Sequence, residues 1–154
     1  MRRLLASLAL TLAALPAPAR EVDDYLAQVP LLPLADAPDV EALLAAQWPA
    51  YWRAPGAEGL GRDDVRAGRV DLDGDGLAEL VVMITADSWE GAQGRPLVVA
   101  AWRKKAWRPV AWSWGELDRV FATREVVDGW RSLDTGREIL RWGGNGYGAE
   151  PRPQ

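Results

Sequence analysis

The sequence predicts an α+β fold, in which an N-terminal helix packs on an antiparallel β-meander that contains one acidic strand-loop-strand hairpin. Three observations support this prediction. Apolar residues recur at helical spacing in only one stretch, near residue 40. From residue 69 onward, short apolar runs alternate with turn signals, as in consecutive strands. An Asp-Gly-rich loop separates the first two of these runs.

The first 19 residues have the pattern of an export signal. Arg2 and Arg3 form a basic start, residues 4–15 are mostly apolar, and Ala17-Pro18-Ala19 supplies small residues for cleavage. A retained membrane anchor is the alternative, but an apolar stretch of about 12 residues is short for a bilayer. We therefore expect a periplasmic or secreted protein with no membrane span after cleavage, whose residues 20–154 form a single domain.

A helix is predicted from Asp36, which suits the N-cap, to Gln47 or Trp52, depending on how Pro49 is accommodated. Residues 20–34 give no comparable pattern. The residues expected to form the buried face of the helix share its period: Val40, Leu43, Leu44 and Trp48. We expect this face to pack on the sheet.

The strands are expected in the second half of the chain. Residues 53–68 are rich in Gly and charge, so they predict a loop. The following apolar runs predict strands: 69–72, 80–86, 96–102, 107–114, 119–127, 130–133 and 138–142. Residues 143–154 are rich in Gly and Pro and predict an edge that frays. Because the intervening turns are short, we expect neighbouring strands to pair in sequence order.

The loop between the first two strands contains acids at regular spacing. Asp71, Asp73 and Asp75 occupy its first, third and fifth positions, and Glu79 occupies the ninth. Side chains at this spacing, with the carbonyl of Leu77 at the seventh position, can converge on one point. Oxygen atoms in such a cage are the ligands that Ca²⁺ prefers. The sequence therefore predicts a calcium site formed by these five residues.

This loop differs from an EF-hand, which needs a bidentate Glu at the twelfth position, where this chain has Val82. Residues 70–84 resemble instead the strand-loop-strand calcium loops of FG-GAP and VCBS-type repeats. The resemblance implies a calcium-binding module and no particular activity. No second copy follows, and the chain after the helix is too short for a closed propeller. The alternative is an acidic turn without metal, in which four carboxylates would repel one another.

Nine of the 154 residues are Trp, and seven of these fall in the predicted β region. They could fill the core, because a small sheet packed on an Ala-rich helix needs bulky side chains, or they could form a ligand surface. We expect most of them to be core residues. If a group is exposed, the candidate binding surface is Trp89, Trp112, Trp114 and Trp142.

Composition excludes several classes of function. The net charge is −4, and removing the signal with its two Arg leaves about −6, so nucleic acid is not an expected partner. With no His and no Cys, catalytic triads and most zinc chemistry are excluded. We expect an exported, non-catalytic calcium-binding module whose partner is a protein, as for an inhibitor or immunity-type protein. The alternative is a carboxylate-dependent hydrolase or a glycan-binding protein acting on cell-wall material.

Overall fold

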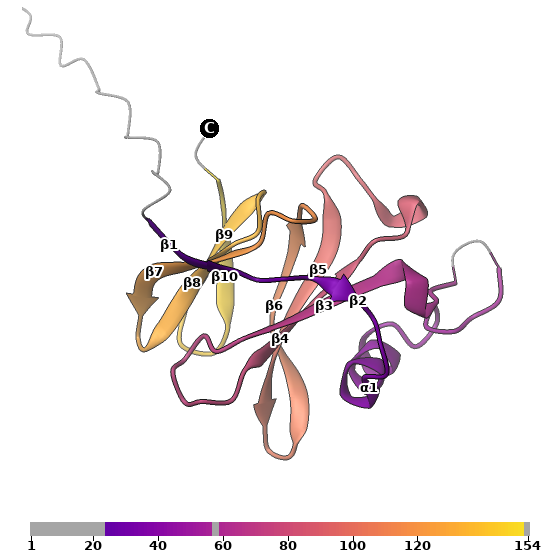
Figure 1. Ribbon diagram of the computed structural model, residues 1–154, viewed down its shortest axis with the longest axis horizontal. Helices are drawn as coiled ribbons and strands as arrows, with labels where there is room; N and C mark the ends of the chain where they lie inside the picture. The colour runs from indigo at the N-terminus through magenta and orange to yellow at the C-terminus, as the bar shows by residue number, and fades with distance from the viewer. Residues whose placement is uncertain (1–23, 57–58, 153–154) are drawn as a thin grey trace, which may run out of the picture.

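Two five-stranded antiparallel sheets dominate the computed structural model, which describes residues 24–56 and 59–152 (Figure 1). The first sheet has the order β2 (Leu32–Pro33), β3 (Val65–Val70), β4 (Glu79–Ile84), β5 (Arg95–Arg103) and β6 (Ala106–Gly115). The second has the order β1 (Tyr25–Gln28), β7 (Phe121–Val127), β8 (Trp130–Asp134), β9 (Glu138–Trp142) and β10 (Tyr147–Pro151). One α-helix, α1 (Pro38–Gln47), and two short 3₁₀ helices, η2 (Arg62–Asp64) and η3 (Asp87–Trp89), complete the described part of the chain.

Strand β4 is buried on both faces, which explains its uninterrupted apolar sequence. Leu80, Val82 and Ile84 belong to a cluster with residues of α1, so this face of the strand packs against the helix. Val81 and Met83 belong to a second cluster that includes residues of β7, β8 and β9. The first sheet therefore lies between the helix on one face and the second sheet on the other.

The core between the sheets is formed by residues that alternate along their strands, as in a β-sandwich. In the first sheet these residues include Leu97 and Val99 of β5, and in the second they include Ala122, Leu133 and Leu140. All five are fully buried, with no exposed surface. Strands β7, β8 and β9 thus cover their apolar face by packing on the first sheet.

The predicted α+β fold is wrong, because the described residues form a β-sandwich-like arrangement of two sheets with one short helix. The single meander was expected because neighbouring strands were assumed to pair throughout. The chain instead leaves the first sheet after β6 and starts a second one at β7. Strand β1 pairs with β7, so two segments far apart in the sequence lie side by side. Local periodicity contains no signal for such a pairing.

Several elements are confirmed and others differ from the prediction. Helix α1 is present, but it begins at Pro38, and the residue at its N-cap is Ala37 rather than Asp36, with no side-chain cap. Strand β3 begins at Val65, inside the predicted loop. Strands β1, β2 and β10 occupy segments in which no strand was predicted.

Within residues 24–56 and 59–152, no helix is both long enough and apolar enough to cross a membrane.

Candidate metal centre

The acidic loop connects β3 to β4, and its first acid organises its backbone. Asp71 accepts hydrogen bonds from the backbone N–H of Gly74 (2.7 Å) and of Gly76 (3.1 Å). Both glycines have positive φ, +76° and +87°, a conformation that residues with a Cβ adopt at a cost. The sequence Asp-x-Asp-Gly-Asp-Gly therefore folds locally, because the carboxylate closes the turn and the glycines allow it.

Glu79 enters the loop from the other side, as the first residue of β4. Its side chain is buried, with only 3% of the residue's surface exposed. Oε2 of Glu79 accepts a hydrogen bond from the backbone N–H of Leu72 (2.8 Å). A residue of the rigid strand thus presents a carboxylate to the loop from a fixed position.

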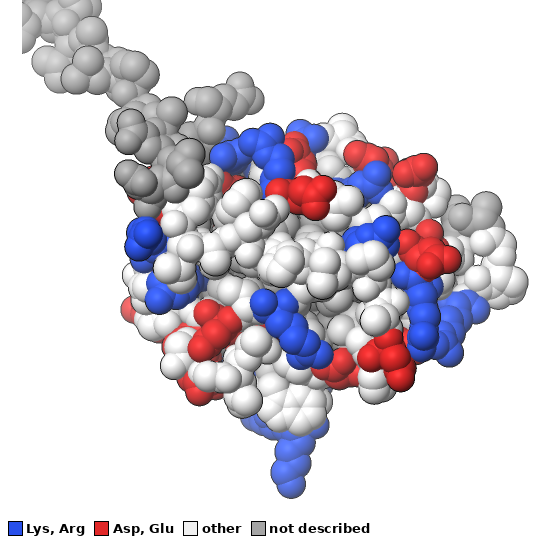
Figure 2. Space-filling view, in the orientation of Figure 1, with Lys and Arg blue, Asp and Glu red and all other residues white. Residues whose placement is uncertain are grey.

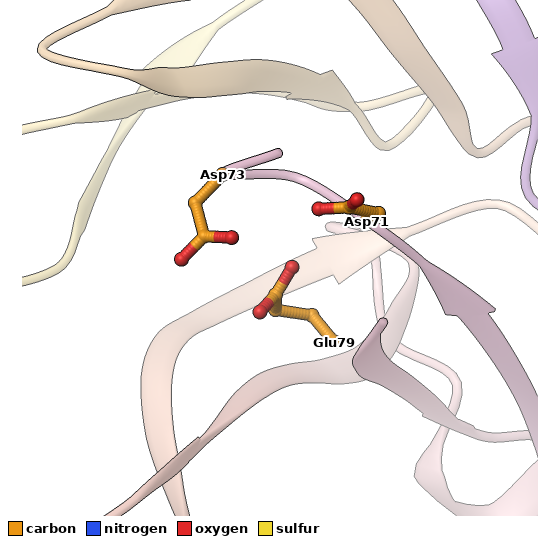
Figure 3. A group of neighbouring side chains, drawn as sticks. All are labelled: Asp71, Asp73 and Glu79. Carbon is orange, nitrogen blue, oxygen red and sulfur yellow. The ribbon is translucent and has the colours of Figure 1, made fainter. Parts of the chain in front are cut away.

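Three acids converge at this point. Asp71, Asp73 and Glu79 each offer a carboxylate oxygen, and these oxygens lie within 4.8 Å of one another. Figure 3 shows the carboxylates of Asp73 and Asp71 on the loop and that of Glu79 facing the space between them. The cluster could hold a metal ion, because three oxygens at this separation can ligate one cation.

The other two predicted ligands do not belong to this group of three. Oδ1 of Asp75 accepts a hydrogen bond from the backbone N–H of Leu77 (2.7 Å). Leu77 is 57% exposed, and it was predicted to bind through its carbonyl. Coordination by the Asp75 carboxylate and the Leu77 carbonyl therefore stays a prediction.

The electrostatics of the cluster are unfavourable without a cation. Burial raises the pKa of Glu79 to about 7, and the charges of Asp73 and Asp75 add to the rise, while the Leu72 N–H opposes it. Burial also raises the pKa of Asp73, with Asp75 and Asp71 contributing further. Among the described residues, no Lys or Arg forms an ion pair with these acids. A bound cation would offset this repulsion.

Three of the four Trp residues predicted as a binding surface lie together. Trp89, Trp112 and Trp114 line one pocket of about 410 Å³. Trp48 joins them from the end of α1, with its ring centroid 5.1 Å from that of Trp112 in an edge-to-face contact. Trp112 is the most exposed member, at 50%.

Trp142 lies elsewhere, in the core. Its ring stacks on that of Trp130, with centroids 4.1 Å apart and planes 9° apart, and both residues are buried. Arg103 lies over both rings, 5.2 Å from each centroid. The structure thus separates Trp142 from the other three predicted surface residues.

The Trp pocket also contains polar groups. Ser113 Oγ donates a hydrogen bond to Oε2 of Glu138 (2.5 Å), and the backbone N–H of Trp114 donates to the same oxygen (3.3 Å). One carboxylate and one hydroxyl therefore lie beside the aromatic rings. Glu138 was not predicted from the sequence, because its position beside Trp114 depends on the contact between β6 and β9.

Sequence reasoning also missed Trp102, which is 48% exposed. It faces Trp107 across the β5–β6 hairpin, with ring centroids 5.5 Å apart. The signal was available, since the two Trp residues flank a predicted four-residue turn and would pair directly across it. This pair lines a separate groove beside α1.

Comparison with known proteins finds no match, whether to a protein-family model, a curated protein or a solved structure.

Proposed function

We propose that this chain is an exported calcium-binding module without catalytic activity, which acts by binding a protein partner. The proposal rests chiefly on the convergence of the Asp71, Asp73 and Glu79 carboxylates in a loop that resembles FG-GAP and VCBS-type calcium loops. The absence of His and Cys from the sequence supports the non-catalytic part.

The ligand set favours calcium over other cations. All the side chains are carboxylates, which suit hard cations and not zinc or copper. Mg²⁺ demands near-ideal octahedral geometry and retains its water, whereas Ca²⁺ accepts irregular oxygen cages. In the described residues, two of the three carboxylates lie on the Asp-Gly loop and the third lies on strand β4.

Calcium would connect two strands of the first sheet. Asp71 and Asp73 follow β3, and Glu79 begins β4, so one ion would link the ends of both strands. By binding only the folded state, it would raise the free energy of unfolding. In this proposal the metal stabilises the loop, and the surfaces beside the loop remain available to a partner.

Calorimetric titration with CaCl₂ tests the metal site. The wild type is expected to release or absorb heat on binding, and Asp73→Asn should lose most of this signal. Asp63→Asn is the matched control, since it removes the same charge from an exposed position outside the loop. A wild type that gives no heat would contradict the proposal.

Export needs a separate test, because residues 1–19 lie outside the described residues. N-terminal sequencing of the protein from its host should return Arg20 as the first residue. Recovery of protein that starts at Met1 would contradict the export signal.

A second candidate function is glycan binding at the Trp48–Trp89–Trp112–Trp114 pocket. Aromatic rings that line a pocket beside a carboxylate and a hydroxyl, with Trp112 exposed, suit a neutral sugar, which has apolar faces and many hydroxyls. Glu138 is the one acid among the residues that line this pocket, whereas glycoside hydrolysis usually needs two carboxylates. The observation therefore favours binding of a glycan and not its hydrolysis.

Fluorescence titration with chitohexaose and cellohexaose tests this second function. Trp112→Ala should abolish any response. Trp102→Ala is the control, because Trp102 is equally exposed but lies outside the pocket. No response from the wild type to either sugar would exclude neutral glycans of these kinds.

A further inference from the structure

A groove lies between α1, the tip of the β5–β6 hairpin and the acidic loop. Two cavities, of about 450 and 560 Å³, share Asp39, Trp102 and Trp107 and so adjoin one another. Leu77 and Ala78 of the acidic loop line the first cavity, which brings the groove next to the candidate metal centre. The size of each cavity is within the range of ligand sites in proteins.

Apart from Asp39, the residues that α1 contributes to this groove are apolar. Ala42 and Ala46, one turn apart, are exposed and line the groove, together with the buried Leu43. The outward face of a surface helix normally has charged or polar residues. Small residues at this spacing also let another chain approach closely. The face therefore has the properties of a helix surface that a partner covers.

The rim of the groove is basic, although the chain as a whole is acidic. Lys105 and Arg108 line the groove, and Lys104 is adjacent in the turn. All three are exposed, and within the described residues none has an ion pair. Basic side chains project at the lower end of the molecule in Figure 2, where Figure 1 places the tip of the β5–β6 hairpin.

The turn at this tip is unusual. Lys104 and Lys105 both have positive φ, 51° and 63°, the conformation of a type I′ turn. Asn-Gly is the favoured pair in such turns, and residues with long side chains adopt it at a cost. Two lysines at these positions are therefore less favourable for the turn than Asn-Gly, and they place two positive charges at its tip.

The walls of the groove are held in place before any partner binds. Arg69 lies over the ring of Trp107, 5.9 Å from its centroid, and forms an ion pair with Asp39 of α1. Trp102 contacts Trp107 edge to face. A preformed groove loses little conformational entropy on binding.

We propose that this groove binds an acidic, amphipathic peptide segment of a partner protein. Its aliphatic side chains lie against Ala42, Ala46 and Trp102, and its carboxylates face Lys105 and Arg108. The inference rests on the proposed function in taking the chain to be a binding module, but it does not require calcium.

The chemistry of the groove favours a peptide over a glycan. A sugar has hydroxyls along its whole length, and each one buried without a partner costs free energy. Along the wall that Ala42, Leu43 and Ala46 form, the groove offers no polar side chain for them, and Asp39 and Arg69 are already paired with each other. A bilayer is also disfavoured, because it cannot fill a concave surface. At the hairpin end of the groove, away from the acidic loop, the charges of Lys105 and Arg108 complement acidic side chains and repel basic ones.

The experiment is a selection from a phage-displayed random dodecapeptide library on the full chain, followed by fluorescence polarisation of the selected peptides. Selected sequences should be rich in Asp, Glu and aliphatic residues. Lys104→Asn/Lys105→Gly should weaken their binding on the order of ten-fold and reduce its salt dependence. This variant installs the favoured turn pair, so its fold is expected to be at least as stable as the wild type.

A second pair of variants tests the apolar wall. Ala46→Gln extends a neutral side chain into the groove and should weaken binding at least ten-fold. Ala45→Gln, on the same helix, is the control, since Ala45 is exposed but does not line either cavity. Equal binding to both variants would overturn the proposal.

Three other results would also contradict the proposal that the groove binds an acidic peptide. No selected peptide, peptides without excess acid, or binding of polygalacturonate instead of peptide would each overturn it. All measurements are made in 1 mM CaCl₂ and again in chelator. A chain that binds acidic peptides but no calcium overturns the metal site alone, and one that binds calcium but no peptide overturns the groove alone.

Discussion

Two buried acids of this protein, Asp134 and Glu79, differ in the charged and hydrogen-bonding groups that surround their carboxylates. They have 1% and 3% of their surfaces exposed. Asp134, at the end of β8, accepts hydrogen bonds from the Tyr25 hydroxyl (2.6 Å) and the Gly136 N–H (2.8 Å), and it forms an ion pair with Arg152 (3.3 Å). The chain itself thus supplies the positive charge that a buried carboxylate requires.

Glu79 accepts one hydrogen bond, from the Leu72 N–H, and has no positively charged side chain paired with it among the described residues. Its carboxylate faces two others, those of Asp71 and Asp73. A buried acid in an acidic surrounding lowers the stability of the fold unless a cation is added. The contrast with Asp134 teaches that burial alone does not mark a metal site. The distinguishing feature is a buried carboxylate whose compensating charge is missing from the neighbouring side chains.

The largest expected effect comes from removing the compensated acid. Asp134→Ala leaves Arg152 and the Tyr25 hydroxyl without their buried acceptor, so the free energy of unfolding should fall by about 2 to 4 kcal/mol. Urea denaturation in chelator and in 1 mM CaCl₂ measures this loss, which should be equal in both. If calcium restored the free energy of unfolding of Asp134→Ala, the proposed difference between the two acids would be wrong.

A smaller effect of opposite sign is expected at the uncompensated acid. At pH 8 in chelator, Glu79→Gln should raise the free energy of unfolding by about 1 to 2 kcal/mol, because it removes one of three like charges and keeps an acceptor for the Leu72 N–H. Calcium should then stabilise the wild type and not the variant. Glu138→Gln, a half-buried acid outside the cluster, serves as the control and should gain nothing in chelator.

The smallest expected effect comes from Gly→Ala substitutions, which distinguish the cost of backbone strain from a loss of metal binding. Gly76→Ala and Gly129→Ala both place a Cβ at positive φ, +87° and +85°, with no atom near the added group. Each should lower the free energy of unfolding by about 1 kcal/mol. Only Gly76→Ala should weaken calcium binding, as measured by calorimetry, because the Gly76 N–H positions Asp71. Equal calcium affinity in both variants would show that the backbone conformation at residue 76 has no effect on the site.

The acidic loop could be predicted from the sequence because its geometry is local. The spacing of Asp71, Asp73 and Glu79 brings three carboxylates together within nine residues, and the glycines between them allow the turn. Strands with strong apolar runs, such as β4 and β5, could be predicted for the same reason. Each depends on the pattern of a few consecutive residues.

The second sheet could not be predicted, since it depends on pairing between distant segments. Tyr25 of β1 lies opposite Thr123 of β7, and nothing in residues 20–34 indicates this partner. The same limit explains why the sequence could not distinguish buried from exposed Trp residues. Trp112 and Trp142 both lie on predicted strands, but the first is half exposed and the second stacks on Trp130 in the core. Which face a strand buries is decided by the layer that packs on it.

The most direct test of the uncompensated-charge account is a thermal melt of the wild type and Asp73→Ala/Asp75→Ala, recorded in chelator and in 1 mM CaCl₂. With a dissociation constant on the order of 10⁻⁴ to 10⁻³ M, as in extracellular calcium modules, binding at 1 mM CaCl₂ should add roughly 0.4 to 1.4 kcal/mol to the free energy of unfolding. This corresponds to a rise in the wild-type melting temperature of about 2 to 6 °C. The double variant should show no rise. An unchanged wild-type melting temperature would contradict the account and leave the loop an acidic turn without metal.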